Sequence, residues 1–407
     1  MQVNRSLQFP LMTDNPRLGW LLKEFRLIVN KSIRIANAGD IRSLGRLCRV
    51  AYADFSQDHE VLKQYISSAF QVALSLLKAH RRRLKKGRSS SLPYVRRPIL
   101  KAGNQSFLLD RVTGRLRVPI RAREYFECTL PLGDWHRTFL NDSEWRIGSL
   151  TIVPDKVIVA MTRLAARPYA PRAAIALDTN EDSLDGVFVM GNHSKLITVP
   201  FQGVRRIQAV HFRRRRSLAR KKRYDQRLAR QLLRQEGLRE RNRVGQRFHR
   251  VSKMLVRVAR QCQAAIIVES LTLVGAGGRS RALNRRLSSW PRGEIHRQIE
   301  YKAALEGVPI IRVNPRNTSK TCPACGAVRR GRAGKVFMCA CGWRMDRQLN
   351  AGLNILRTAV ASNEALARAV RFQPGALRHD VVIPLYDLLR EGVGAREEPS
   401  GVELGIV

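Results

Sequence analysis

Four cysteines stand within twenty residues, in two pairs. Cys322 and Cys325 form a Cys-x-x-Cys pair followed by glycine, and Cys339 and Cys341 form a shorter Cys-x-Cys pair about thirteen residues later. Thiolates at this spacing are typical ligands of a zinc ribbon, and the glycine lets backbone amides turn toward the sulfur atoms. We therefore expect a structural zinc site within residues 319–345. A redox pair or inert thiols are the alternatives.

Three acidic residues border apolar segments in the same half of the chain. Asp178 ends the apolar run 173–177, and Glu269 ends a second run, 264–268. Short apolar runs predict buried strands, and adjacent strands of a mixed sheet would bring the two acids to one edge. Asp346 opens a helical segment five residues after the last cysteine, and that helix can pack across the same edge.

Three carboxylates at one edge have a defined chemistry. They repel one another unless a cation compensates their charge. Magnesium prefers such oxygen ligands and keeps water in its remaining positions. Two ions about 4 Å apart can activate water and stabilise the leaving oxygen of a phosphodiester, as in RNase H-like nucleases. We therefore expect Mg²⁺ at Asp178, Glu269 and Asp346.

Each acid also has a purely structural interpretation. Asp178 can open a hairpin turn, and nearby Asp182 and Asp185 compete with it as the first acid. Glu269 can end a strand at the surface, and Asp346 can cap its helix. The order in which strands, ribbon, helix and acids follow one another favours the catalytic interpretation of all three.

The charge of the chain indicates a polyanionic partner. Its 407 residues carry 75 Lys and Arg against 32 Asp and Glu, a net charge of +43, and 44% of them are apolar. This length allows two or three domains, and this charge favours nucleic acid over an anionic membrane. Seven cysteines, four of them clustered, indicate a reducing compartment. Without a long apolar segment or a signal peptide, we expect a cytoplasmic protein with no membrane partner.

Residues 204–262 are predicted to be long, helical and very basic. Two runs of basic residues in this segment are candidates for contact with nucleic-acid phosphates. They comprise Arg213, Arg214, Arg215, Arg216, Arg220, Lys221, Lys222 and Arg223. A solvated surface would explain a small excess of positive charge, but not an excess of about one residue in ten.

The hydrophobic periodicity predicts an α+β chain of several domains. Before residue 170 it predicts a first strand, two inserted helices and then the short strands of a small β-barrel or sandwich. The expected strands are 1–13, 107–109, 116–120, 126–130, 147–152, 156–161, 173–177, 186–190, 195–201, 264–268 and 308–313. The expected helices are 20–36, 61–80, 204–262, 289–306 and 346–361.

Several motifs carry a resemblance to a known family. They are Ile-Glu-Tyr-Lys-Ala at 299–303, Gly-Val-Pro-Ile at 307–310, Asn-Pro-Arg-Asn-Thr-Ser-Lys-Thr-Cys-Pro at 314–323 and Asp-Arg-Gln-Leu-Asn-Ala-Gly-Leu-Asn-Ile at 346–355. The chain resembles the TnpB (OrfB) family of transposon-encoded RNA-guided nucleases, and the compact type V CRISPR effectors derived from them. The similarity spans about 170–360 and extends to 1–170 only as an order of elements.

The resemblance implies a division into domains. The implied parts are a wedge β-barrel (1–14 and 91–170), a helical recognition lobe (15–90), an RNase H-like RuvC nuclease domain (171–318 and 346–362), an inserted zinc ribbon that binds the target nucleic acid (319–345) and a mobile C-terminal tail (363–407). Thr179 and Asn180 depart from the family, which often has a small residue and Gly after the first acid. The short second cysteine pair is another departure, and neither departure removes a carboxylate.

The resemblance also implies an activity. It is the cleavage of target DNA beside a short adjacent motif, directed by a bound guide RNA, with Asp178, Glu269 and Asp346 as the catalytic triad. It further implies phosphate-orienting roles, and hence nucleic-acid contact, near this site for Arg316, Ser319, Arg347 and Asn350. The implied cofactors are Mg²⁺, structural Zn²⁺ and guide RNA, and the implied location is the prokaryotic cytoplasm or nucleoid.

Two other functions stay open at this point. One is a guided DNA-binding regulator that no longer cuts, although such a protein has no reason to keep all three acids. The other is an unguided transposase that uses the same acids for strand transfer. The sequence does not specify the guide RNA, the adjacent motif or the oligomeric state.

Overall fold

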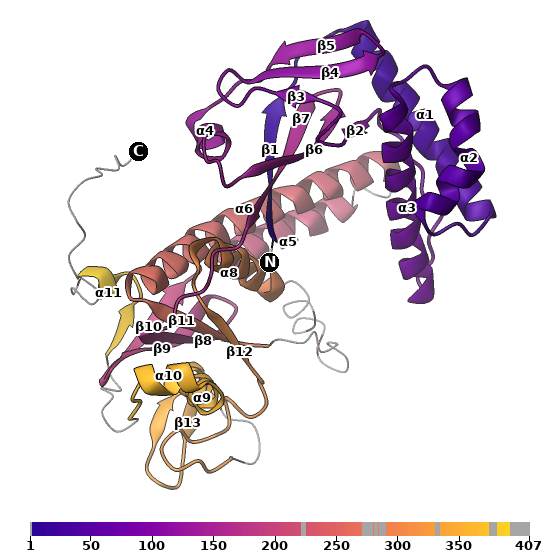
Figure 1. Cartoon of the computed structure of the whole chain (residues 1–407). Helices are drawn as coiled ribbons and strands as arrows, with labels where there is room; N and C mark the ends of the chain where they lie inside the picture. The colour runs from indigo at the N-terminus through magenta and orange to yellow at the C-terminus, as the bar shows by residue number, and fades with distance from the viewer. Residues whose placement is uncertain are drawn as a thin grey trace. The chain divides into compact units, whose positions relative to one another are not determined.

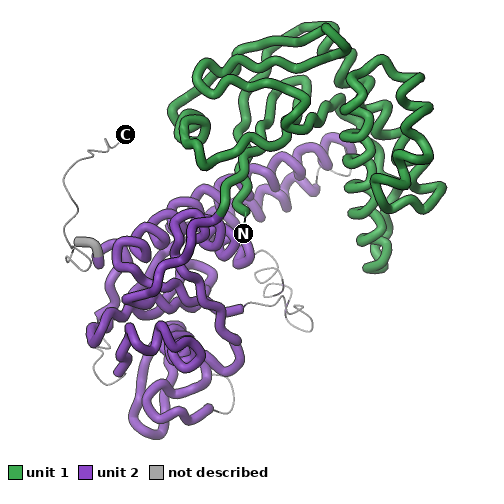
Figure 2. The backbone as a smooth tube through the Cα atoms, in the orientation of Figure 1, with its two compact units in different colours: residues 1–164 green, residues 165–407 purple. Residues whose placement is uncertain are grey.

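The computed structural model divides the chain into two compact units, residues 1–164 and 165–407 (Figure 2). The residues that the structure describes are 2–220, 225–270, 280, 284, 290–329, 334–373 and 381–390. The predicted site residues Lys221, Lys222 and Arg223 lie outside these described residues. No helix among the described residues is both long enough and apolar enough to cross a membrane.

The first unit contains two antiparallel sheets. A four-stranded sheet has the order β1-β7-β6-β2, and a three-stranded sheet has the order β3-β4-β5. The strands are β1 (Gln2–Pro10), β2 (Leu100–Ala102), β3 (Leu108–Leu109), β4 (Arg115–Arg121), β5 (Glu124–Thr129), β6 (Arg146–Val153) and β7 (Lys156–Leu164). In β1, Val3, Leu7 and Phe9 are buried, as the apolar alternation predicts. The strands expected in a barrel or sandwich thus form two separately hydrogen-bonded sheets.

Helices of the first unit follow its first strand. They are α1 (Pro16–Ala38), α2 (Leu44–Asp58) and α3 (Lys63–Lys85), with a short α4 (Asp134–Leu140) later in the chain. Asn15 caps α1, since its side chain accepts hydrogen bonds from the backbone N–H groups of Arg17 and Leu18. The expected helices 20–36 and 61–80 are confirmed as α1 and α3. Helix α2 was not predicted, because its buried apolar stripe contains only Leu47, Ala51 and Phe55.

The second unit is built on a six-stranded mixed sheet with the order β12-β11-β8-β9-β10-β15. Its strands are β8 (Ala173–Thr179), β9 (Ser183–Met190), β10 (His193–Pro200), β11 (Ala264–Glu269), β12 (Ile310–Val313) and β15 (Val382–Pro384). Strands β8, β9 and β10 are antiparallel, whereas β11 runs parallel to both β8 and β12. All six residues of β11 are buried, because helices cover both faces of a sheet of this kind.

Helices cover the two faces of this sheet (Figure 1). One face packs against α6 (Gln226–Gln261) and α8 (Arg292–Glu306), with α5 (Val204–Arg220) beside α6. The other face packs against α9 (Arg347–Ser362) and α10 (Glu364–Ala369). Strand β8 contributes Ile175 to the first core and Ala176 to the second, which is the period of two expected of a strand. The expected helix 204–262 is therefore two described helices, α5 and α6.

The segment after residue 362, expected to be a mobile tail, contains three elements among its described residues. They are α10, β15 and α11 (Asp387–Arg390). Strand β15 pairs in parallel with β10. Leu385 and Leu388 are fully buried in the core on the α6 side of the sheet, and burial of these two side chains explains why this part of the tail is ordered.

A pair of glycines sets how closely α9 approaches the sheet. A Cβ added at Gly352 of α9 would stand 2.5 Å from the Cα of Gly186 in β9. Real side chains do not tolerate such a distance, so the helix would have to move away from the strand. The start of α9, and Asp346 with it, therefore depends on this contact.

The Gly352→Ala variant should lower the free energy of unfolding by about 1–3 kcal/mol, because overpacking displaces α9. Gly245→Ala is a matched control within α6, where an added Cβ meets no atom within 4 Å. There the change should raise stability by up to about 1 kcal/mol through helix propensity. Urea unfolding of both variants measures the two effects. Equal stability of G352A and the natural protein would contradict the close approach.

Candidate functional site

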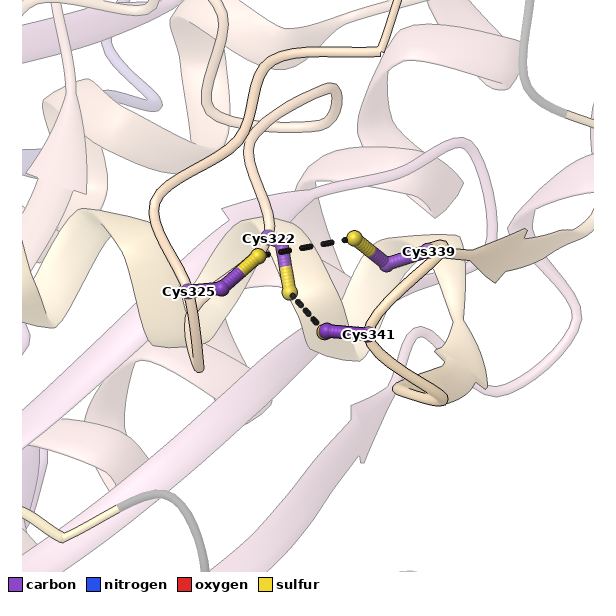
Figure 3. Close-up of side chains that lie close together, drawn as sticks. All are labelled: Cys322, Cys325, Cys339 and Cys341. Carbon is purple, nitrogen blue, oxygen red and sulfur yellow. Dashed lines mark hydrogen bonds between the residues drawn. The ribbon is translucent and has the colours of Figure 1, made fainter.

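The four cysteines of the ribbon gather around one point. Their sulfur atoms all lie within 4.8 Å of one another. The Sγ atoms of Cys322 and Cys341 are 3.6 Å apart, and those of Cys325 and Cys339 are 3.5 Å apart (Figure 3). Tetrahedral Zn²⁺ with Zn–S bonds of about 2.3 Å requires sulfur separations of roughly 3.8 Å. The donor set and its spacing therefore fit zinc.

Backbone turns explain why the short second pair still fits. Gly326 and Gly342 follow the two pairs with φ angles of +78° and +87°, which favour glycine. The turn after the second pair is closed by a hydrogen bond from the Cys339 N–H to the Trp343 carbonyl, within the hairpin of β13 (Val336–Met338) and β14 (Arg344–Asp346). Hydrogen bonds from the Ala327 N–H and with the neighbouring cysteines lower the pKa of the Cys325 thiol to about 7, which favours the thiolate form that binds metal. Burial instead raises the pKa of the Cys322 thiol.

Two of the predicted acids lie on neighbouring strands. Strands β8 and β11 are parallel, with Leu177 opposite Val268, so Asp178 and Glu269 follow as the next residues of the two strands. Burial and, to a lesser extent, the charge of Glu269 raise the pKa of Asp178 to about 7. Burial also raises the pKa of Glu269, which is 7% exposed. The sheet therefore places two carboxyl groups where ionisation of either one is unfavourable.

The third acid caps the helix that crosses this sheet. The Asp346 Oδ1 atom accepts hydrogen bonds from the backbone N–H groups of Gln348 and Leu349, at 2.7 and 3.4 Å. The structural interpretation of Asp346 is thus correct, and the cap engages its Oδ1 atom. The positive charge of the next residue, Arg347, lowers the pKa of Asp178, so the first turn of α9 lies near the two strand ends.

The three carboxylates do not by themselves form a tight cluster. Within the described ranges, the cysteine group is the only set of three or more Cys, His, Asp or Glu ligand atoms that all lie within 4.8 Å of one another. Two acids of raised pKa, half-buried Asp178 and buried Glu269, together with the exposed Asp346 form a donor set that suits Mg²⁺.

The free energy of unfolding should depend on pH, because the carboxyl group of Asp178 is difficult to ionise in the folded protein. Its pKa in the folded state, about 7, lies above its ordinary value of 3.8, so the stability that the neutral carboxyl group contributes at low pH is lost as pH rises through 7. Without added divalent cation, D178N should equal the natural protein in stability below pH about 4 and exceed it at pH 8. The gain should be of order 1–3 kcal/mol.

Urea unfolding of the zinc-loaded proteins at the two pH values measures this difference. Added Mg²⁺ should remove the advantage of D178N at pH 8, since a cation compensates the carboxylate that only the natural protein carries. An advantage of the same size at both pH values would contradict the pKa shift.

The competing acids have other roles in the structure. Asp182 is exposed and lies 3.4 Å from the Arg205 guanidinium, as a surface ion pair. Asp185 is buried opposite Asp178, and its charge also raises the pKa of Asp178. Its carboxylate accepts hydrogen bonds from Ser183 and Thr198 at 2.5 Å and from the Asn180 amide at 2.8 Å. Asp185 is therefore a neighbour of the first acid with its own hydrogen-bond partners.

Two polar contacts beside the acids were not predicted. Thr179 follows Asp178, and its hydroxyl group lies 2.8 Å from the Nε2 atom of buried His296 in α8. Thr318 donates a hydrogen bond of 2.6 Å to Oε1 of Glu269. Neither contact is visible in the sequence, because Thr179 meets His296 and Thr318 meets Glu269 only through the folding of distant segments.

A protein-family profile described as the Cas12f1-like TNB domain matches residues 293–355. A TnpB-like protein of Methanocaldococcus jannaschii is 24% identical over 60% of this chain and 90% of its own length. A CRISPR-associated endodeoxyribonuclease Cas12f1 of Sulfoacidibacillus thermotolerans is 33% identical over 26% of this chain and 25% of its own length. The chain is similar to TnpB-like proteins. The expected resemblance is therefore confirmed, although the chain spans only a quarter of that Cas12f1 protein.

Two solved structures share the fold of this chain. One is the cryo-EM structure of a Cas12f1-sgRNA-target DNA complex, with a TM-score of 0.59, 16% identity and coverage of 85% of this chain and 83% of that one. Another is the mini-RNA-guided endonuclease CRISPR-Cas_phi3, with a TM-score of 0.54, 10% identity and coverage of 88% and 92%. The mixed α/β fold of compact type V effectors is thus shared over most of the chain.

The predicted nucleic-acid contacts differ in exposure. Arg213, Arg214, Arg216 and Arg220 of α5 are exposed, whereas Arg215 is partly buried in an ion pair with Glu240 of α6. Among the motif residues, Arg316 and Arg347 are exposed and Ser319 is half-buried. Asn350 is fully buried in this structure. Its amide group bonds to the Trp343 indole and the Thr321 carbonyl, so it fixes the ribbon to α9.

Proposed function

We propose that this chain is an RNA-guided DNA endonuclease with a RuvC-type active site formed by Asp178, Glu269 and Asp346. One observation carries the proposal most: two acids of raised pKa end adjacent parallel strands, beside the first turn of the helix that Asp346 caps. The names of its relatives support the same activity, since they include CRISPR-associated endodeoxyribonucleases. The fold is also similar to that of the protein in a solved Cas12f1-sgRNA-target DNA complex.

The three acids would hold Mg²⁺, and the four cysteines would hold structural Zn²⁺. Bound magnesium would supply charge stabilisation for the phosphodiester and activation of water. Strands β8 and β11 fix Asp178 and Glu269 at one sheet edge, while the Gly186–Gly352 contact sets the distance of α9 from that sheet. Exposed Arg316 and Arg347 would orient the phosphate backbone.

Sequence recognition would come from base pairing with the guide RNA. In such a system the protein holds phosphate backbones and reads a short duplex element, which requires much positive charge. The net charge of +43 and the exposed arginines of α5 meet that requirement. The domain roles proposed with this function are a wedge barrel and recognition lobe in residues 1–170, and a nuclease domain with a target-binding ribbon in residues 171–362.

One experiment separates this function from its alternatives. The protein is expressed with the DNA that flanks its gene, the RNA that co-purifies is sequenced, and the complex is incubated with a plasmid library that carries the guide-matched target. We expect Mg²⁺-dependent cleavage beside one short motif. Guided binding without cleavage would indicate a silent regulator. Joining of transposon ends by RNA-free protein would indicate a transposase.

A further inference from the structure

The hydroxyl group of Thr318 reaches the second acid from the segment that leads into the ribbon. Thr318 is 6% exposed, and its Oγ1 atom lies 2.6 Å from Oε1 of Glu269 and 3.2 Å from the Pro315 carbonyl oxygen. A hydroxyl group has one proton, and a hydrogen bond to a charged carboxylate is the stronger of the two. Thr318 therefore fixes one oxygen of Glu269 when that acid is charged.

The backbone around Thr318 is held in turn by α9. The Asn354 amide nitrogen donates to the carbonyl oxygens of Thr318 and Thr321, at 2.8 and 2.7 Å, and the Asn350 amide nitrogen donates to Thr321 at 3.0 Å. Both asparagines are buried. Residue 322, directly after Thr321, is the first cysteine of the zinc site. The chain from the zinc site to Thr318 is thus fixed to the helix that Asp346 caps.

We propose that Thr318 is a positioning residue that orients Glu269 for cation binding and ties the position of this acid to the cysteine site. This inference rests on the proposed function for the role of Glu269 as a magnesium ligand. The hydroxyl group acts on one carboxylate oxygen only, which leaves the other oxygen to a cation. Without the hydroxyl, the carboxylate would lose its orientation and its only charge-assisted partner in this segment.

Partners that orient a metal-binding carboxylate typically contribute about 10- to 100-fold to metal affinity. We therefore expect Thr318→Val, which removes the hydroxyl group at nearly constant volume, to weaken Mn²⁺ binding about 10- to 100-fold. Thr318→Ser keeps the hydroxyl and should restore most of the affinity. Thr321→Val is a matched control, because the Thr321 hydroxyl donates to the Asn317 carbonyl and not to an acid. It should bind Mn²⁺ as the natural protein does.

The measurement is a Mn²⁺ titration of the full-length, zinc-loaded protein, followed by electron paramagnetic resonance. Zinc content and the free energy of unfolding are measured on the same samples and should not differ between T318V and the natural protein by more than T321V does. If T318V does not fold, T318A is used in the same comparison. Unchanged Mn²⁺ affinity in a folded variant, or the same loss in T318S, would overturn the proposal.

Mn²⁺ binding is read without cleavage, so the two proposals can fail separately. A natural protein that binds Mn²⁺ through Glu269 but cuts no guided target would refute the endonuclease and leave the role of Thr318 standing. Cleavage by the natural protein together with unchanged Mn²⁺ affinity in T318V would refute the role of Thr318 and leave the endonuclease proposal standing.

Discussion

The Asp178→Asn variant should lose target cleavage by about a thousandfold or more and still bind guide RNA and target DNA. Asparagine keeps the size of the side chain but removes the negative charge that a cation needs at this strand end. Loss of metal-based charge stabilisation is worth several kcal/mol in the transition state, and each 1.4 kcal/mol changes the rate about tenfold. Guided binding depends instead on base pairing and on the basic surface, which this change does not touch.

Single-turnover cleavage and filter binding of the same ribonucleoprotein measure the two quantities. Asp182→Asn is the matched control, because Asp182 lies four residues away in a surface ion pair with Arg205. Exposed pairs of this kind contribute little, so D182N should cleave at the natural rate. A cleavage defect of equal size in both variants would remove Asp178 from the active site.

Loss of zinc should have the second large effect. Structural zinc sites contribute about 10 kcal/mol or more to the folding of small ribbons. Cys322→Ser removes one ligand whose side chain is fully buried in the core that α9 and the ribbon share. We expect C322S to lose its zinc, to be cut by protease within residues 319–345, and to lose cleavage because Thr318 and Asp346 flank this segment.

Zinc content by mass spectrometry and limited proteolysis of the intact chain test this expectation. Cys128→Ala provides the control, because Cys128 lies in β5 of the other unit, far in sequence from the ribbon. C128A should keep one zinc per chain and the natural proteolysis pattern. Retention of a full equivalent of zinc by C322S would contradict the assignment of the ligands.

Much of the second unit could be predicted, because the burial of its strands is visible in the sequence. The runs 173–177 and 264–268 are apolar at every position, since helices cover both faces of the sheet, and Asp178 and Glu269 stand out as their first polar neighbours. The cysteine site was equally visible, because its ligands are close in sequence. Its spacing predicted a zinc site, with a redox pair or inert thiols as the alternatives.

The remaining features depend on contacts between distant segments. Thr318 meets Glu269 across 49 residues, and Thr179 meets His296 across 117. Asn350 lies in a motif that suggested phosphate contact, yet its amide group forms hydrogen bonds with Trp343 and Thr321 of the ribbon. A polar residue in a motif can serve either folding or ligand binding, and only the burial of its side chain separates the two.

The central claim is that Asp178, Glu269 and Asp346 bind cations together, and a Mn²⁺ titration of the zinc-loaded chain tests it most directly. We expect the natural protein to bind two Mn²⁺ ions in a site of this class. D178N, E269Q and D346N should each weaken or abolish that binding, while D182N leaves it unchanged. A D346N protein that titrates like the natural one would show that the helix cap takes no part in the site, and would contradict the account.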